Sequence, residues 1–235
     1  MYKARLYTTL LSLGAILSVN TTSFGQLSQR SEVGFGLGVF NYTGDITRTY
    51  DITTSKPAAT VFYRSNISKV ISLRVAITGG QLAASDKHNP LDSAAIKRNA
   101  SFNIFLLEAS STFEYHFLDW RDDRHRLRFT PYLFAGVGLF GISGNNAKTK
   151  SYSNVQMSIP FGGGVKYVLN PKYYIAFEIG IRKTFFDYLD NISGGNTTVK
   201  NYQYGNPNDY DNYFFTGITL TYTFYDIPCP SSPYR

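Results

Sequence analysis

Three histidines are the residues of this 235-residue chain that could act as general bases: His88, His116 and His125. A base of this kind activates a nucleophile when the two side chains lie within hydrogen-bonding reach. His88 and His125 lie in polar stretches typical of loops, and His116 follows Glu114 by two positions in an alternating segment. No serine is found on a matching phase where a catalytic partner would be expected. We therefore predict no catalytic residue and interpret His116 as a structural side chain.

Six charged residues recur at alternating positions within otherwise apolar segments. They are Arg74, Glu108, Glu114, Lys166, Glu178 and Arg182. Three are basic and three are acidic, and buried charges must pair because an unpaired one carries a large desolvation cost. We predict that these side chains form a charge network that fills the interior of the fold. A path for ions or solutes is the alternative function of such residues.

Metal, cofactor and nucleic-acid binding have weak sequence signals. Cys229 is the only cysteine, which excludes an internal disulfide and a CxxC motif. Four aspartates near the last long polar segment lack the spacing and the glycine of a calcium-binding EF-hand loop: Asp187, Asp190, Asp209 and Asp211. The net charge is +7, but lysine and arginine are scattered and form no basic run. We predict no metal, no cofactor and no nucleic-acid partner.

Strict alternation of apolar and polar residues is the main structural signal, and it predicts β-strands. Aromatic residues make up 16% of the chain and charged residues 17%, against about 25% charged in an average soluble domain. On nearly every segment one phase is bulky and uncharged, while the other carries Gly, Ser, Thr and the charges. The eight predicted strands are Val33–Val39, Ala58–Ser65, Ile71–Thr78, Phe105–Phe117, Tyr132–Leu139, Ser158–Tyr167, Ile175–Thr184 and Gly217–Phe224.

Two folds use eight such strands: a soluble lipocalin-like barrel with its apolar face inward, and a membrane barrel with that face outward. The connections favour the membrane barrel because short and long ones alternate. Three are short (66–69, 119–126 and 170–172) and four are long (44–56, 80–100, 143–154 and 187–212). Outer-membrane barrels have short periplasmic turns and long external loops. The predicted fold is therefore all-β: an eight-stranded antiparallel transmembrane up-and-down β-barrel.

The N-terminus has the pattern of a secretory signal peptide. Lys3 and Arg5 precede an apolar run from Leu6 to Val19, and small residues lead to a predicted cleavage site after Gly25. An uncleaved helical anchor is the alternative, but the run is short for a span of about 20 residues. We predict a signal peptide over 1–25, a barrel over 26–225 in contact with outer-membrane lipid, and a periplasmic tail over 226–235. Both mature termini would lie in the periplasm.

Several segments together resemble a known family. They are GVFNYTGD (38–45), FTPYLFAGVG (129–138), SIPFGGGVKY (158–167), RKTFFDYLDNISG (182–194) and GNPNDYDNYFFTGITLTYTF (205–224), followed by Cys229-Pro230. This set resembles the PorG family, an outer-membrane component of the type IX secretion system in Bacteroidetes. One departure is that Gly138-Leu139-Phe140-Gly141 is not followed by the Asn-Pro expected there, which leaves a paralogue without a secretion role as an alternative.

The resemblance implies a non-enzymatic part in protein secretion that is also tied to gliding motility. It implies contact with a periplasmic ring built from a PorK-like lipoprotein and a PorN-like protein. We expect the contact at a charged turn and at the proline-containing tail, through Trp120, Arg121, Arg124, Cys229 and Pro230. An enzyme that acts on lipid A or phospholipid is the alternative function for a barrel of this size.

Overall fold

The structure is a computed structural model that describes residues 31–44, 46, 50, 54–85, 101–118, 128–143, 153–170, 172–185, 189 and 211–224. Eight antiparallel strands make up almost all of it. They are β1 (Ser31–Thr43), β2 (Lys56–Asn66), β3 (Ile71–Ser85), β4 (Ser101–His116), β5 (Phe129–Ser143), β6 (Val155–Asn170), β7 (Tyr173–Thr184) and β8 (Asn212–Phe224). Among the described residues, no helix is long and apolar enough to cross a membrane.

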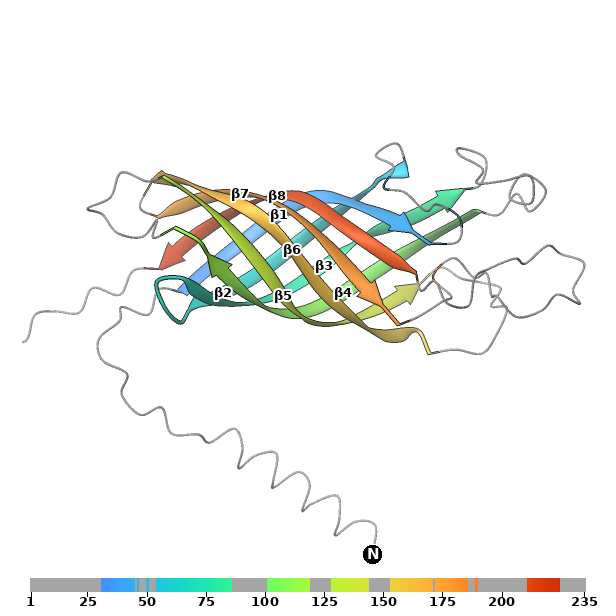
Figure 1. The fold of residues 1–235 in the computed structure, drawn as a ribbon. Coiled ribbons are helices and arrows are strands. Elements are labelled where there is room, and N and C mark those ends of the chain that lie inside the picture. The colour runs from blue at the N-terminus through green and yellow to red at the C-terminus, as the bar shows by residue number, and fades with distance from the viewer. Residues whose placement is uncertain are drawn as a thin grey trace, which may run out of the picture.

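Each strand pairs with its neighbours in sequence, and β1 pairs with β8, so the sheet closes into a barrel (Figure 1). Cross-strand partners followed once around the barrel, starting at Ser31 of β1, lead back to Asn41 of the same strand. This stagger of ten residues accounts for the pronounced tilt of the strands, because stagger and tilt are linked in a closed barrel. The predicted fold class is confirmed.

The two ends of the barrel differ. The turn end carries the start of β1, the end of β8 and the connections 67–70, 117–128 and 171–172; the loop end carries the connections 44–55, 86–100, 144–154 and 185–211 (Figure 1). The predicted sorting by length is only partly correct, since 117–128 is no shorter than 144–154. The connection 117–128 is longer than the predicted 119–126 because β4 ends at His116 and β5 begins at Phe129.

The outer wall is apolar and exposed. Side chains on the bulky phase of each strand point outward, with exposed fractions such as 63% for Leu37, 51% for Val75 and 53% for Phe177. Their sequence neighbours Gly36, Arg74 and Glu178 are buried inside the barrel. Period-two alternation therefore sorts the two faces as the sequence predicted.

Several strands extend further toward the loop end than predicted. β1 continues to Thr43, β3 to Ser85 and β5 to Ser143, while β4 begins at Ser101. The predicted signal peptide (1–25) and the tail (226–235) lie outside the described residues. The described part of the predicted barrel domain runs from Ser31 to Phe224.

Candidate functional site

The half of the lumen nearest the turn end, which we call the charged half, contains a chain of alternating carboxylates and guanidinium groups. Arg64 contacts Glu32 at 2.7 Å and Glu114 at 2.8 Å. Arg74 in turn contacts Glu114 at 3.2 Å and Glu178 at 2.5 Å. All five side chains are buried, and each arginine bridges two carboxylates. Each of these buried charges therefore has at least one partner of opposite charge.

Two neutral side chains, one further cation and an aromatic ring complete this network. The Asn66 amide donates to Glu32 at 2.7 Å, and the Tyr132 hydroxyl donates to Glu178 at 2.9 Å. The Lys166 ammonium lies 3.8 Å from Glu32 and above the ring of Tyr132. The ring of Phe62 lies under both Arg64 and Arg74, which adds cation–π contacts. Charged and aromatic side chains thus fill the cross-section of the barrel together.

Glu108 and Arg182 form a separate ion pair, nearer the loop end of the barrel. The Arg182 Nε atom lies 3.6 Å from Glu108, and the Tyr213 hydroxyl donates to the same carboxylate at 2.5 Å. Arg182 also donates to the carbonyl of Gly180 and lies above the ring of Phe215. The structure therefore places all six predicted network residues inside the barrel, in two groups rather than one.

The sequence-based list of inward charges omitted Glu32 and Arg64. Both are fully buried, and Arg64 is central because it joins two carboxylates. A phase argument would have found them: Arg64 shares the inward phase with Thr60, and Glu32 shares it with Gly34. Glu32 was missed because the predicted first strand began at Val33, two residues after the observed start at Ser31.

The half of the lumen nearest the loop end, which we call the apolar half, has the opposite composition. It is a cluster of buried apolar and aromatic side chains: Phe40, Tyr42, Ile46, Ala58, Leu82, Ala84, Phe102, Ile104, Leu106, Phe140, Ile142, Leu189, Tyr213 and Phe215. Edge-to-face ring pairs link Phe40 to Tyr213 and Phe215, and Phe140 to Tyr213. The sequence analysis assigned Gly, Ser, Thr and charges to the inward phase of the predicted strands, and most of these apolar residues lie beyond the limits that it gave those strands.

Two residues from the long connections help to close the apolar half. Ile46, from the connection between β1 and β2, and Leu189, from the connection between β7 and β8, are fully buried in the cluster. Asp211 holds this arrangement, because its carboxylate accepts hydrogen bonds from the Tyr42 hydroxyl and, at 2.8 Å, from the Leu189 amide. Of the four aspartates considered for calcium, only Asp211 lies within the described residues, and it makes these hydrogen bonds. Asp187, Asp190 and Asp209 lie outside the described residues.

His116 lies beside a serine that the sequence analysis did not connect with it. The Ser72 hydroxyl oxygen lies 3.4 Å from Nε2 of His116, and Glu114 approaches the same nitrogen at 3.4 Å. In a serine–histidine–acid relay the serine and the acid use different ring nitrogens. Ser72, His116 and Glu114 are also fully buried at the turn end.

The five residues predicted to contact a partner all lie outside the described part of the chain: Trp120, Arg121, Arg124, Cys229 and Pro230. His88 and His125 lie outside it as well. Within the described ranges, no group of three or more His, Cys, Asp or Glu side chains has a geometry that could hold a metal ion.

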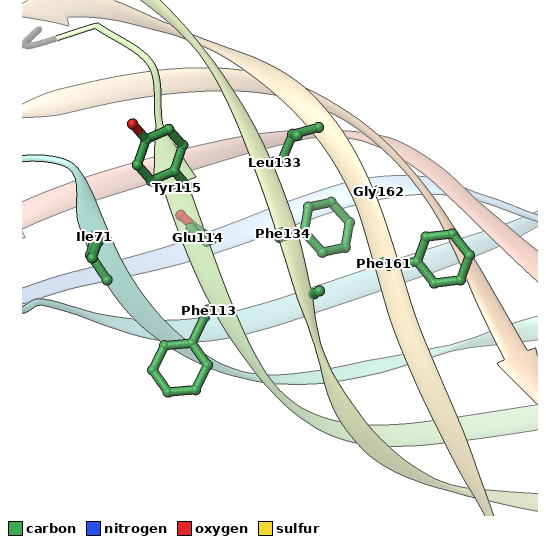
Figure 2. A pocket seen from close by; sticks show the side chains of 9 residues that line it. Ile71, Phe113, Glu114, Tyr115, Leu133, Phe134, Phe161 and Gly162 are labelled. Atoms are coloured by element: carbon green, nitrogen blue, oxygen red, sulfur yellow. The ribbon is translucent and has the colours of Figure 1, made fainter.

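A groove of about 610 Å³ crosses the outer wall over β4, β5 and β6 (Figure 2). Phe113 and Tyr115 of β4, Leu133 of β5 and Phe161 of β6 surround it, and Ile71 of β3 lies at its turn-end side. Its lining is almost entirely apolar. It is a hollow in the outer surface, and Glu114, Phe134 and Gly162 from the inward phase also line it.

These features define a class: a small closed outer-membrane β-barrel with an apolar exterior and a packed interior. The chain belongs to the family described as a domain of unknown function, DUF6089, whose model matches residues 8–232. No curated protein matches the sequence.

Solved structures of bacterial surface proteins share the architecture. Neisserial surface protein A is 13% identical with a TM-score of 0.52, and the match covers 83% of this chain and 97% of that protein. Ail of Yersinia pestis, solved with the heparin analogue sucrose octasulfate, is 11% identical (TM-score 0.46; 84% and 100% covered). OprG of Pseudomonas aeruginosa is 9% identical (TM-score 0.45; 86% and 99% covered). At these identities the likeness to Neisserial surface protein A defines the fold alone.

Proposed function

We propose that this protein is a non-enzymatic barrel component of the type IX secretion machinery that contacts a periplasmic ring of PorK-like and PorN-like proteins. The turn end faces the periplasm in this proposal, with both mature termini, and the long connections face outward. Short turns on the periplasmic side are the rule for outer-membrane barrels. The secreted cargo does not pass through the barrel.

The filled lumen is the observation that carries this proposal. The charged half is closed by ion pairs, and the apolar half is closed by packed rings and by Ile46 and Leu189. A barrel of eight strands has room for its own side chains and little else. A protein built this way acts through its surfaces, as an anchor or a docking partner does.

The assignment to the type IX secretion machinery rests on the resemblance to the PorG family. Its most specific segment, SIPFGGGVKY, lies within β6, where Gly162 and Gly164 allow the close approach of β7 and of the Tyr132 ring. The second specific segment, DYLD (187–190), contains Leu189, which is buried in the apolar half. Both segments thus contribute to the interior that keeps the barrel closed.

The ring contact in this proposal uses the turn 119–127 and the tail. Arg121 and Arg124 lie among acidic and aromatic neighbours in the sequence, and such mixed-charge turns favour specific pairing with a partner. The tail has prolines at 228, 230 and 233, which restrict the chain and lower the entropy lost on binding.

The test is co-purification of PorK-like and PorN-like proteins with the barrel from solubilised outer membranes. We expect recovery to fall with R121E/R124E or with deletion of 228–235, at equal barrel expression. Lys183→Glu is the matched control, because Lys183 is an exposed cation at the loop end. Undiminished recovery with both changes combined would exclude the turn and tail as the docking site.

Two alternatives are separated by deletion of the gene. A secretion component predicts reduced export of cargo with unchanged lipid A. An enzyme acting on lipid A or phospholipid predicts an altered acyl pattern by mass spectrometry. A paralogue with only a structural role predicts neither change.

A further inference from the structure

The groove in the outer wall has a defined cause in the sequence. Ala135 of β5 points outward, and its cross-strand partners are Phe113 on β4 and Phe161 on β6. A methyl group between two rings leaves a hollow where the rest of the wall carries bulky side chains. Next to it, outward-facing Gly163 pairs with Leu133, and a Cβ atom there would lie 3.1 Å from the Leu133 side chain. The hollow thus runs across three adjacent strands (Figure 2).

An interruption of the strand pairing adjoins the groove. β5 and β6 keep one register from Ala135 and Phe161 to Gly138 and Ser158, and ladder pairs are missing only at the two positions between them, Gly136 and Val137. Pro160, which has no N–H to donate to a ladder, lies at this interruption. A proline inside a sheet removes one backbone hydrogen bond from the ladder. The groove therefore lies beside a proline that offers no backbone N–H to either neighbouring strand.

The groove is polar at one end only. At the turn end it reaches Ile71 and Tyr115, and the Tyr115 ring packs edge-to-face against Phe117. Tyrosines at such a position mark the boundary between hydrocarbon and headgroups. Lys69, which is exposed, precedes Ile71 by two residues. From there the groove continues along Phe113 and Ala135 toward the middle of the wall.

From these observations we propose that the groove binds one acyl chain of a glycerophospholipid whose phosphate lies near Lys69 and Tyr115. The headgroup then belongs to the leaflet at the turn end. In the orientation proposed above, that leaflet is the periplasmic one, so the ligand is a phospholipid and not lipid A. A membrane-embedded hollow gains nothing from the hydrophobic effect, since lipid tails are as apolar as its lining. Binding comes from the additional van der Waals contacts that a matched chain makes with Phe113, Phe161 and Leu133.

The experiment uses the full barrel in vesicles of phosphatidylethanolamine that carry a trace of the same lipid with a photoreactive acyl chain. We expect crosslinks concentrated on peptides from β4, β5 and β6. Ala135→Phe fills the hollow and should lower crosslinking there about tenfold, equivalent to about 1.4 kcal/mol. Ala109→Phe, which adds the same ring to an exposed wall position outside the groove, should leave it unchanged. A heat-dependent gel shift verifies that each variant is folded.

Each other outcome contradicts the proposal. Crosslinks spread evenly over all eight strands mean that the lipid is bulk solvent only. Crosslinks obtained with photoreactive lipid A and not with the phospholipid assign the groove to the other leaflet. Absence of crosslinks on β4, β5 and β6 of the parental protein means that the groove holds no lipid chain. None of these results depends on secretion activity, so the groove proposal can fail while the secretion role stands; only its choice of leaflet rests on the orientation proposed above.

Discussion

The charged half and the apolar half of the lumen solve the same packing problem with opposite chemistry. Near the turn end, Arg64 and Arg74 link three carboxylates, with aromatic rings beside them. Near the loop end, phenylalanine, tyrosine and aliphatic side chains pack together, and a single ion pair, Glu108–Arg182, borders the described cluster through Tyr213. In the charged half each charge has specific partners, and removing one residue alone leaves a buried charge without its counter-charge. The apolar half is stabilised by the close packing of its side chains. Both leave the barrel closed, and they should respond differently to substitution.

The largest effect is expected from Arg74→Met in the charged half. The change leaves Glu114 and Glu178 without one of their cations, and breaking a buried ion pair costs about 3–5 kcal/mol. Reversible urea unfolding in lipid vesicles measures the loss. Arg74→Met combined with Glu178→Met should recover part of it, because the unpaired carboxylate is removed with the cation. A double variant no more stable than the single one would contradict the ion-pair account.

Ile104→Ala tests the apolar half. Ile104 is 2% exposed within the cluster, and truncation of such a side chain costs about 2–5 kcal/mol through lost burial and a residual cavity. Unfolding in urea at low and high salt checks the mechanism. We expect the loss to be the same at both, since no charge is involved. A loss that disappears at one salt concentration would mean that this half depends on electrostatics.

Val75→Arg compares the outside of the wall with the inside at adjacent positions. Val75 is 51% exposed on the outer face, whereas Arg74 points into the lumen. An arginine in the lipid band costs about 2–4 kcal/mol at the bilayer midplane. The measurement is folding yield and urea stability in vesicles, with Val75→Leu as control. A variant as stable as the parent would place this part of β3 outside the lipid.

A smaller effect is expected from Tyr42→Phe at the loop end. The substitution removes a hydrogen bond to the Asp211 carboxylate and keeps the ring that packs against Phe102. Hydrogen bonds to charged groups contribute about 1.5–3 kcal/mol. Amide hydrogen exchange at Leu189, whose N–H donates to Asp211, should speed up more than exchange at the centre of β7. Equal exchange at both sites would show that Asp211 does not hold the connection.

No ion conductance is expected from the parent protein or from Ile104→Ala. Opening one half leaves the other closed, because the charged and apolar halves lie in series along the barrel. Planar-bilayer recordings test this directly, with a porin as positive control. Stable current steps that change with Glu178→Gln would favour a solute path over a closed scaffold.

Much of the wall was predictable from local pattern alone. Alternation places Val75 outside and Arg74 inside whatever the neighbouring strands are, because successive side chains of a strand point to opposite faces. The limits of the strands were less predictable. Loop-end segments such as β3 beyond Thr78 alternate weakly, since Gly79, Gly80, Ala83 and Ala84 give little contrast. This segment adopts the β-strand conformation because Leu82 and Ala84 pack within the apolar cluster.

The sequence by itself determined the fold class, the outward apolar face and the inward position of the six predicted charges, because these follow from period-two patterning and from the need to bury charge away from lipid. Only the tertiary structure decided which charges pair. Glu108 pairs with Arg182, whereas Glu114 of the same strand pairs with Arg64 and Arg74, since the stagger of the barrel sets the level of every residue. The apolar half and the groove at Ala135 were likewise decided there. Each depends on side chains from several strands meeting at one level, which no single segment encodes.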